Sequence, residues 1–132
     1  MSTWTPDEVD RIGGAHEMRI AGRRRDGSLR TPVIVWLVRS GDDLYTRSVN
    51  GPDAAWFRGT RPRHEGHISA GGVEKDVEFV DVEADAAVND DIDDAYRAKY
   101  GRNSSPVAAI TGPQARSTTL KLLPSNNSEK DN

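Results

Sequence analysis

Alternating apolar and polar positions in the middle of the chain predict a series of β-strands. The longest apolar stretch lies in Thr31–Arg39, and a strand that is apolar on both faces is expected to be covered on both. Gly41-Asp42-Asp43 then predicts a turn into a second strand, Leu44–Val49, so that the two form a hairpin. Each face of the first strand carries three apolar residues: Val33, Val35 and Leu37 on one, and Ile34, Trp36 and Val38 on the other.

A second hairpin is predicted about Gly71-Gly72, between His64–Ala70 and Val73–Glu83. The apolar residues of its later strand change parity, which predicts a β-bulge or a bend at a barrel corner. Val73, Val77 and Phe79 keep one parity, and Val80 and Val82 take the other. Weaker strands are predicted over Glu17–Arg24 and Arg116–Leu123.

Two helices are predicted from their end signals. Thr5-Pro6-Asp7-Glu8 has the pattern of a capping box, and Gly13-Gly14 ends that helix after about two turns. Asn89–Gly101 has acids in its first turn, cations in its last turn and a terminal glycine, as the helix macrodipole favours. Ser125–Asn132 has nothing to bury and is predicted to be disordered.

This order of elements predicts a mainly β protein. Five or six antiparallel strands with one helix at the start and one inserted late are typical of a small β-barrel with added helices. With 132 residues the chain is long enough for one core and too short for two. We therefore expect one domain over residues 1–123, followed by a disordered tail over residues 124–132.

Composition and charge narrow the choice of partners. Only 35% of residues are hydrophobic and 30% are charged, so we expect a second copy of the chain to complete some apolar surface. The net charge of −3 argues against a general nucleic-acid binder. Cations nevertheless outnumber acids in the first half of the chain, which is where an anion would bind.

The sequence lacks the residues and motifs that several kinds of catalytic, metal and membrane site require. There is no cysteine, which excludes thiol catalysis, disulfides and thiolate metal sites. No apolar run reaches the roughly 20 residues that cross a bilayer, and the polar start is no signal peptide, so we expect a cytoplasmic protein without a membrane partner. His64 and His67 fall on opposite faces of a strand, and Asn89–Asp94 lacks the glycine and glutamate of a calcium loop. Motifs of serine hydrolases, P-loops and dinucleotide sites are also missing.

Basic and aromatic residues of the first half are candidates for a ligand site. Guanidinium groups bind phosphate in a bidentate fork, and a strand-end serine and the loop N–H groups around Asn50-Gly51 add donors. An aromatic ring and the strand with apolar residues on both faces supply walls for a flat heterocycle. Singly, these residues have plainer interpretations: a solvated turn, a cross-strand ion pair and a core tryptophan. Together, at the ends of two hairpins, they predict a pocket for a planar anion. The candidates are Arg24, Arg25, Ser28, Arg30, Arg47, Ser48, Gly51 and Trp56.

The same stretches resemble the flavin- and deazaflavin-binding split-barrel superfamily. Its deazaflavin-dependent nitroreductases have a comparable order of a basic glycine-containing turn, an R-T-P-like strand start, a Gly-Asp hairpin, a strand ending in serine and a P-x-W-Y-like segment. The closest resemblance is to an uncharacterised bacterial family, domain of unknown function 2255, and it covers residues 1–123. The L-Y-x-R-S…G…W-[FY]-R string of that family is present as Leu44, Tyr45, Arg47, Ser48, Gly51, Trp56, Phe57 and Arg58.

The resemblance implies an FMN-binding split β-barrel-like fold with six strands, a homodimer, and FMN or a deazaflavin in a groove between subunits. By position, Arg47, Ser48 and the loop to Trp56 would hold the phosphate and one face of the ring. The turn with Arg24, Arg25 and Ser28, together with Arg30, would reach the phosphate or a polyanionic tail. The implied activity is that of an oxidoreductase acting on a small organic substrate.

Other functions remain open at this stage. The same barrel could serve as a cofactor-free protein that binds a small acidic or aromatic metabolite, because a fold does not fix a function. A non-redox enzyme acting on an aromatic natural product is a further alternative. No catalytic residue is identified, and Tyr45, His64 and His67 are the candidates for a proton donor.

Overall fold

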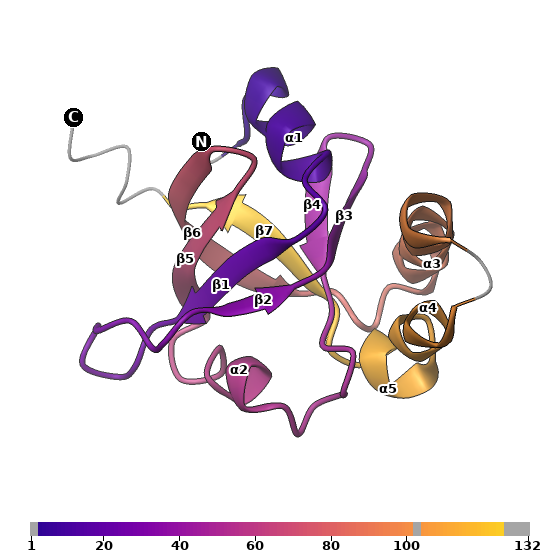
Figure 1. The fold of residues 1–132 in the computed structure, drawn as a ribbon. Helices are drawn as coiled ribbons and strands as arrows, with labels where there is room; N and C mark the ends of the chain where they lie inside the picture. Colours follow the sequence, from indigo (N-terminus) through magenta and orange to yellow (C-terminus); the bar gives the residue numbers. More distant parts are fainter. Residues whose placement is uncertain (1–2, 102–103, 126–132) are drawn as a thin grey trace.

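The computed structural model describes residues 3–101 and 104–125, and a curled antiparallel sheet forms its centre (Figure 1). Within the described residues, seven strands follow the spatial order β2-β1-β5-β6-β7-β4-β3. All neighbouring strands are antiparallel, and the sheet forms a nearly closed barrel, so the predicted fold class is confirmed. The strands are β1 (Met18–Gly22), β2 (Val33–Val35), β3 (Leu37–Ser40), β4 (Asp43–Thr46), β5 (Glu65–Ala70), β6 (Val73–Asp81) and β7 (Leu120–Pro124).

The barrel closes at Trp36. The strand predicted over Thr31–Arg39 is interrupted there, so that β2 pairs with β1 while β3 pairs with β4. β2 and β3 are the two ends of the sheet order, yet they are consecutive in the chain, so this one residue joins both ends of the sheet. Six chain segments therefore yield seven strands.

Helices cover the ends and one side of the barrel (Figure 1). The helix α1 lies at one end, the short helix α2 lies at the opposite end, and α3, α4 and α5 are grouped on one side. The capping box of α1 is present, with Thr5 and Glu8 each bonding the other's backbone N–H. The helices are α1 (Pro6–Gly13), α2 (Ala55–Arg58), α3 (Ala86–Tyr100), α4 (Ser105–Ile110) and α5 (Pro113–Arg116).

Two hydrophobic clusters lie on the two sides of the sheet. The inner cluster fills the barrel, with fully buried residues such as Leu37, Leu44 and Ile68. The outer cluster joins the sheet to the α3 side, where Val38 and Tyr45 of the hairpin pack with Tyr96. Two-sided burial therefore holds for β3, as the sequence predicts.

The same prediction is wrong for β2. Val33 is 37% exposed and Ile34 is 54% exposed, because β2 lies at the edge of the sheet with β1 as its one pairing strand among the described residues. Of the two alternatives predicted in Val73–Glu83, the bulge is wrong, since β6 keeps one register with β5 and one with β7 throughout, while the bend at a barrel corner stays a prediction. Val82 packs against the outer cluster, which explains the change of parity.

The predicted boundaries differ most near the C-terminus. α3 begins three residues before the predicted Asn89, with Asp85 accepting the Val88 N–H as its N-cap. The strand predicted over Arg116–Leu123 is wrong in its first half, because Arg116 ends α5 and β7 begins at Leu120. The predicted domain end at residue 123 falls inside β7, and the buried Ser125 donates its N–H to the Asp76 carbonyl. The rest of the predicted tail, residues 126–132, lies outside the described residues.

Candidate functional site

A cavity of about 300 Å³ opens beside β2, on the side where α4 meets the barrel. β2 supplies one wall, and Trp36 lies at its end. Arg47 and Asn50 come from the segment after β4, and Trp56 comes from α2. Predicted ligand residues from two different elements therefore border one space. The lining residues are Glu17, Val33, Ile34, Val35, Trp36, Arg47, Val49, Asn50, Trp56, Pro106 and Ile110.

Trp36 is held in place by the end of α3. Its indole stacks on the Tyr100 ring, with centroids 3.9 Å apart and planes at 6°. The Tyr100 hydroxyl accepts the Leu37 N–H at 3.3 Å and donates to the His16 carbonyl at 2.7 Å. Lys99 Nζ donates to the Leu37 carbonyl at 2.8 Å, and burial lowers the pKa of this amine to about 8. The N–H and carbonyl of Leu37, next to the strand interruption, are thus hydrogen-bonded to side chains, as buried backbone groups require.

Arg47 is fully buried, and the protein itself occupies its guanidinium group. Its Nε donates to Thr119 Oγ1 at 2.9 Å, and its Nη1 donates to the Asp93 carboxylate and to the Ile110 carbonyl. Its Nη2 donates to the carbonyl and the side-chain oxygen of Asn89 at 3.2 and 2.9 Å. A guanidinium group has five N–H donors, so these five bonds use all of them.

The charge of Arg47 is compensated by Asp93 within the protein. Burial lowers the pKa of the Arg47 guanidinium, and the bonded Asp93 carboxylate opposes that shift. Asp93 also accepts a bond from Arg116 at 2.8 Å through its second oxygen. The resulting network, which we call the Arg47 network (Arg47, Asn89, Asp93, Arg116 and Thr119), fastens α3 and α5 to the barrel. Phosphate binding by Arg47 stays a prediction. The observed hydrogen bonds make Arg47 a structural residue that connects α3 and α4 to the barrel.

The turn after Arg47 is fixed by backbone bonds. Ser48 donates its N–H to Thr118 Oγ1 at 2.8 Å, and Gly51 donates its N–H to the Ser48 carbonyl at 3.0 Å. Gly51 has φ +83° and lies against Gln114, so a side chain would be strained and crowded there. Ser48 Oγ is buried without a hydrogen-bond partner among the described residues. Ser48 and Gly51 therefore adjoin the cavity without lining it.

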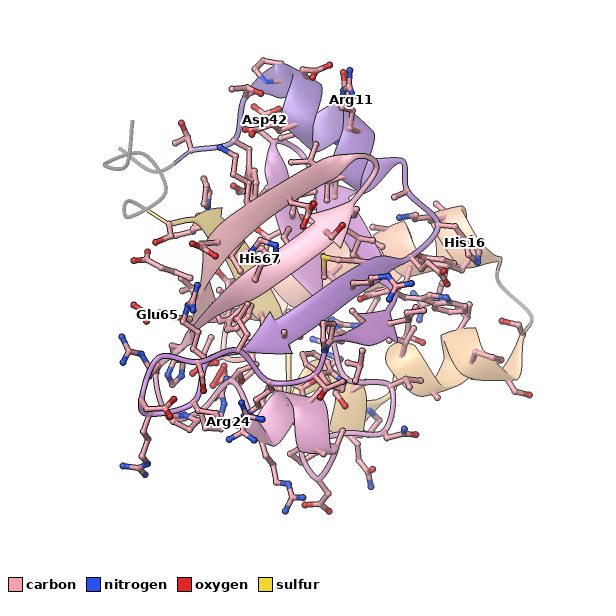
Figure 2. The ribbon with its side chains drawn as sticks, turned by 60° about the vertical axis from the view of Figure 1, so that its left-hand side comes forward. Arg11, His16, Arg24, Asp42, Glu65 and His67 are labelled. Atoms are coloured by element: carbon pink, nitrogen blue, oxygen red, sulfur yellow. The ribbon has the colours of Figure 1, made fainter. Side chains whose placement is uncertain are left out.

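The basic turn between β1 and β2 is not part of the cavity wall. Arg24 and Arg25 are exposed, and Figure 2 shows Arg24 on the loop that follows β1. Arg24 Nη1 donates to Ser28 Oγ at 3.3 Å and to the Leu29 carbonyl at 2.9 Å. Ser28 in turn donates through its Oγ and its N–H to Asp26, and these bonds lower the pKa of that carboxyl. The donors of the turn are thus used largely within the turn.

Arg30 joins this turn to the helix that carries Trp56. Its N–H donates to the Gly22 carbonyl at 3.0 Å, and its side chain packs on Gly59, where a Cβ would lie 2.6 Å from Arg30 Cδ. Arg30 Nε is buried without a hydrogen-bond partner among the described residues. Of the four predicted residues in this turn, Arg30 is therefore the one that reaches toward α2.

The predicted proton donors lie elsewhere. Tyr45 is buried in the outer cluster, where desolvation raises the pKa of its hydroxyl. His64 bonds Asp81 at 3.1 Å, and His67 bonds Asp76 and Glu74 at 3.0 and 3.3 Å. None of these three residues lines the cavity. In the described part of the chain, no group of three or more His, Asp or Glu side chains could hold a metal ion.

The strand with apolar residues on both faces, which the sequence predicts as a wall, supplies Val33, Ile34 and Trp36 to the lining. Sequence reasoning missed Glu17 and the α4 residues of the lining, and it considered only the backbone N–H of Asn50. α4 gave no signal, since its six residues are too few for a helical period. Glu17 stands just before a weak strand, and no local pattern distinguishes it from an ordinary surface acid.

This arrangement suits a flat and largely apolar ligand. Two indoles and the aliphatic side chains of β2 supply van der Waals contact, while Glu17 and Asn50 supply polar atoms at the edge. Within the described residues, neither Glu17 nor Asn50 has a side-chain hydrogen bond or an ion pair. No helix in residues 3–101 and 104–125 is long and apolar enough to cross a membrane.

Comparison with known proteins places the chain among bacterial barrels. The family profile described as "Uncharacterized protein conserved in bacteria (DUF2255)" matches residues 8–122. No curated protein matches the sequence.

Solved structures support the fold. A conserved hypothetical protein, Rv2991, from Mycobacterium tuberculosis is 9% identical with a TM-score of 0.57, over 92% of this chain and 80% of that chain. A putative 5-nitroimidazole antibiotic resistance protein from Bacteroides thetaiotaomicron is 12% identical with a TM-score of 0.53, over 96% and 82%. An F420 reductase, 12% identical over 88% and 90%, has a TM-score of 0.49, which is too low to support an argument. At these identities the likeness shows a shared barrel fold.

Proposed function

The chain belongs to the bacterial DUF2255 family, and from that premise we propose that it binds a flavin or a deazaflavin and acts as an oxidoreductase on a small organic substrate. The main support is that Arg47 and Trp56, which the family motif holds nine positions apart, border one cavity with an apolar strand as its wall. Had the two side chains lain on different sides of the barrel, the proposal would have no site.

The residues present fit the ring of such a cofactor better than they fit its phosphate. Trp56 and β2 offer apolar walls to a flat ring system. A phosphate would have to use donors other than Arg47. Ser48 Oγ and Arg30 Nε have no hydrogen-bond partner among the described residues, and buried polar atoms are mostly paired in native proteins. We propose these two groups, with Arg24 and Arg25 of the exposed turn, for the parts of the cofactor that extend beyond the cavity.

When bound, a flavin-type ring supplies hydride transfer, and the protein supplies orientation and electrostatics. In this chain the orientation would come from the β2 wall, from Trp56 and from Trp36, which Tyr100 keeps immobile. The Arg47 network would hold α4 and its residues Pro106 and Ile110 at the cavity edge, because the Ile110 carbonyl accepts a bond from Arg47.

The first experiment is an absorbance spectrum of the purified protein, followed by titration with FMN and with a deazaflavin under fluorescence detection. We expect binding of one of them by the wild-type protein and a loss of at least about tenfold in affinity for Trp56→Ala, the equivalent of about 1.4 kcal/mol. The reason is that the substitution removes one wall of the cavity.

Trp4→Phe is the matched control for this titration. Trp4 is a second tryptophan, and it belongs to the barrel interior, where its Nε1 donates to the Leu122 carbonyl away from the cavity. We expect the flavin affinity of this variant to equal that of the wild type. Equal flavin affinity of Trp56→Ala and wild type would show that the site is wrongly placed.

A second candidate function is a cofactor-free protein that binds a small aromatic metabolite in the same cavity. The observation that favours it is the full use of the Arg47 donors, which leaves the cavity without a free guanidinium group for a phosphate. A colourless protein whose melting temperature ignores FMN and deazaflavins, and rises with another aromatic compound, would support this function over the first.

We also propose that the protein is a homodimer in which the partner covers β2. Val33 and Ile34 on β2 and Val49 in the turn after β4 are all more than a third exposed, and all three line the cavity. A second copy docked on this patch would bury apolar surface and close the cavity at the same time.

A further inference from the structure

Among the described residues, the charge balance of the cavity lining is negative. These lining residues include two charged ones, Glu17 and Arg47. Arg47 is neutralised by Asp93 within the buried network, and all of its donors point to protein atoms. Glu17 is exposed at the cavity, and it has no ion pair within the described residues. Among the described lining residues, the one uncompensated charge that a ligand meets is therefore a carboxylate.

The aromatic residues of the cavity are suited to a positive charge. Trp36 has one face covered by Tyr100, which leaves the other face and the ring edges for neighbours. Trp56 is half-buried and meets Phe57 edge to face, with ring centroids 6.1 Å apart. The face of an indole attracts cations through its quadrupole, and tryptophan does so more strongly than the other aromatic residues. Two indoles and an unpaired carboxylate border the same small space.

We propose that the ligand taken up by this cavity is a planar organic cation, an aromatic group that bears an amine or amidine nitrogen, with Glu17 as its counter-ion and specificity determinant. The aromatic part contacts β2 and the indoles, and the cationic nitrogen faces Glu17. The inference rests on the second candidate function, the binding of an aromatic metabolite, because the aromatic part of this ligand takes the walls that a flavin ring would otherwise contact. It departs from the sequence-based expectation of a planar anion, since the guanidinium group on which that expectation depends is buried and satisfied.

Three compounds that share one ring test the sign of the charge. Benzamidine, benzamide and benzoate are cationic, neutral and anionic, and each is titrated into the protein by isothermal titration calorimetry. We expect benzamidine to bind at least about tenfold more tightly than benzoate, with benzamide in between. In Glu17→Gln, which keeps the size of the side chain, benzamidine should lose about that factor and the three compounds should bind alike.

Glu83→Gln is the control variant, because it makes the same change in net charge at an exposed acid that does not line the cavity. It should keep the full preference for benzamidine. Benzoate binding as tightly as benzamidine, a preference that survives in Glu17→Gln, or an absence of binding by all three compounds would each overturn the inference.

Flavin titrations of the same samples separate this inference from the proposed function. Flavin binding without any preference for the cation contradicts the inference alone. A Glu17-dependent preference without flavin binding supports the inference and favours the cofactor-free function. A protein that binds neither flavin nor benzamidine overturns both.

Discussion

At the scale of single residues, Arg47 shows that a motif residue can border a cavity while its hydrogen-bond partners escape prediction. Its position in the L-Y-x-R-S string locates it beside the cavity, as the sequence predicts. The sequence could not show that Asn89 and Asp93 would reach it from a helix more than forty positions later. An arginine with five internal bonds stabilises the fold, whereas an exposed arginine would have been free for a ligand.

We predict that Arg47→Ala lowers the free energy of unfolding by about 3–5 kcal/mol, because it removes five buried hydrogen bonds and leaves the buried Asp93 with the partly exposed Arg116 as its remaining cation. Urea denaturation followed by circular dichroism measures the loss. Arg11→Ala removes an exposed ion pair with Asp7 and should cost less than about 1 kcal/mol. A loss from Arg47→Ala as small as that from Arg11→Ala would mean that the Arg47 network contributes little.

At the scale of elements, the two hairpins were predictable and the small helices were not. Gly41-Asp42 and Gly71-Gly72 are strong local turn signals, and both hairpins form where they predict. α2 and α5 have four residues each, so neither has a complete hydrophobic period to detect. The interruption of the long strand at Trp36 depends on Tyr100 and Lys99 at the end of α3, which is a contact that no local pattern contains.

We predict that the two hairpin turns respond differently to the same substitution. Gly41 and Gly71 have φ of +63° and +59°, so alanine should cost about 1–2 kcal/mol of conformational strain at each. A Cβ at Gly41 meets nothing within 4 Å, whereas one at Gly71 would collide with the Arg11 carbonyl of α1. Gly71→Ala should therefore be the more destabilising by about 1–3 kcal/mol, the usual cost of overpacking. Equal midpoints of urea unfolding for the two variants would show that the contact with α1 does not add to the cost of a side chain at Gly71.

At the scale of the whole molecule, the barrel brings its exposed apolar strand and its cavity to the same place. Most exposed apolar residues of a soluble protein are scattered and need no explanation. Here Val33, Ile34 and Val49 share the lining of one cavity, and β2 has a free edge in the described structure. Only 35% of the residues are hydrophobic, and three of them are nevertheless left exposed in this patch. Both observations favour a second chain that buries the patch.

We predict that Ile34→Asp converts the proposed dimer to a monomer, because it puts a charge into the centre of the patch that a partner would bury. Sedimentation velocity across a range of protein concentrations measures the change, and the dissociation constant should rise at least about a hundredfold, or about 2.7 kcal/mol. Val80→Asp is the matched control, since Val80 has a similar exposure of 38% but lies on β6 and not in the cavity. A wild-type protein that sediments as a monomer throughout, or an Ile34→Asp variant that associates as the wild type does, would leave the cavity as a site formed by one chain.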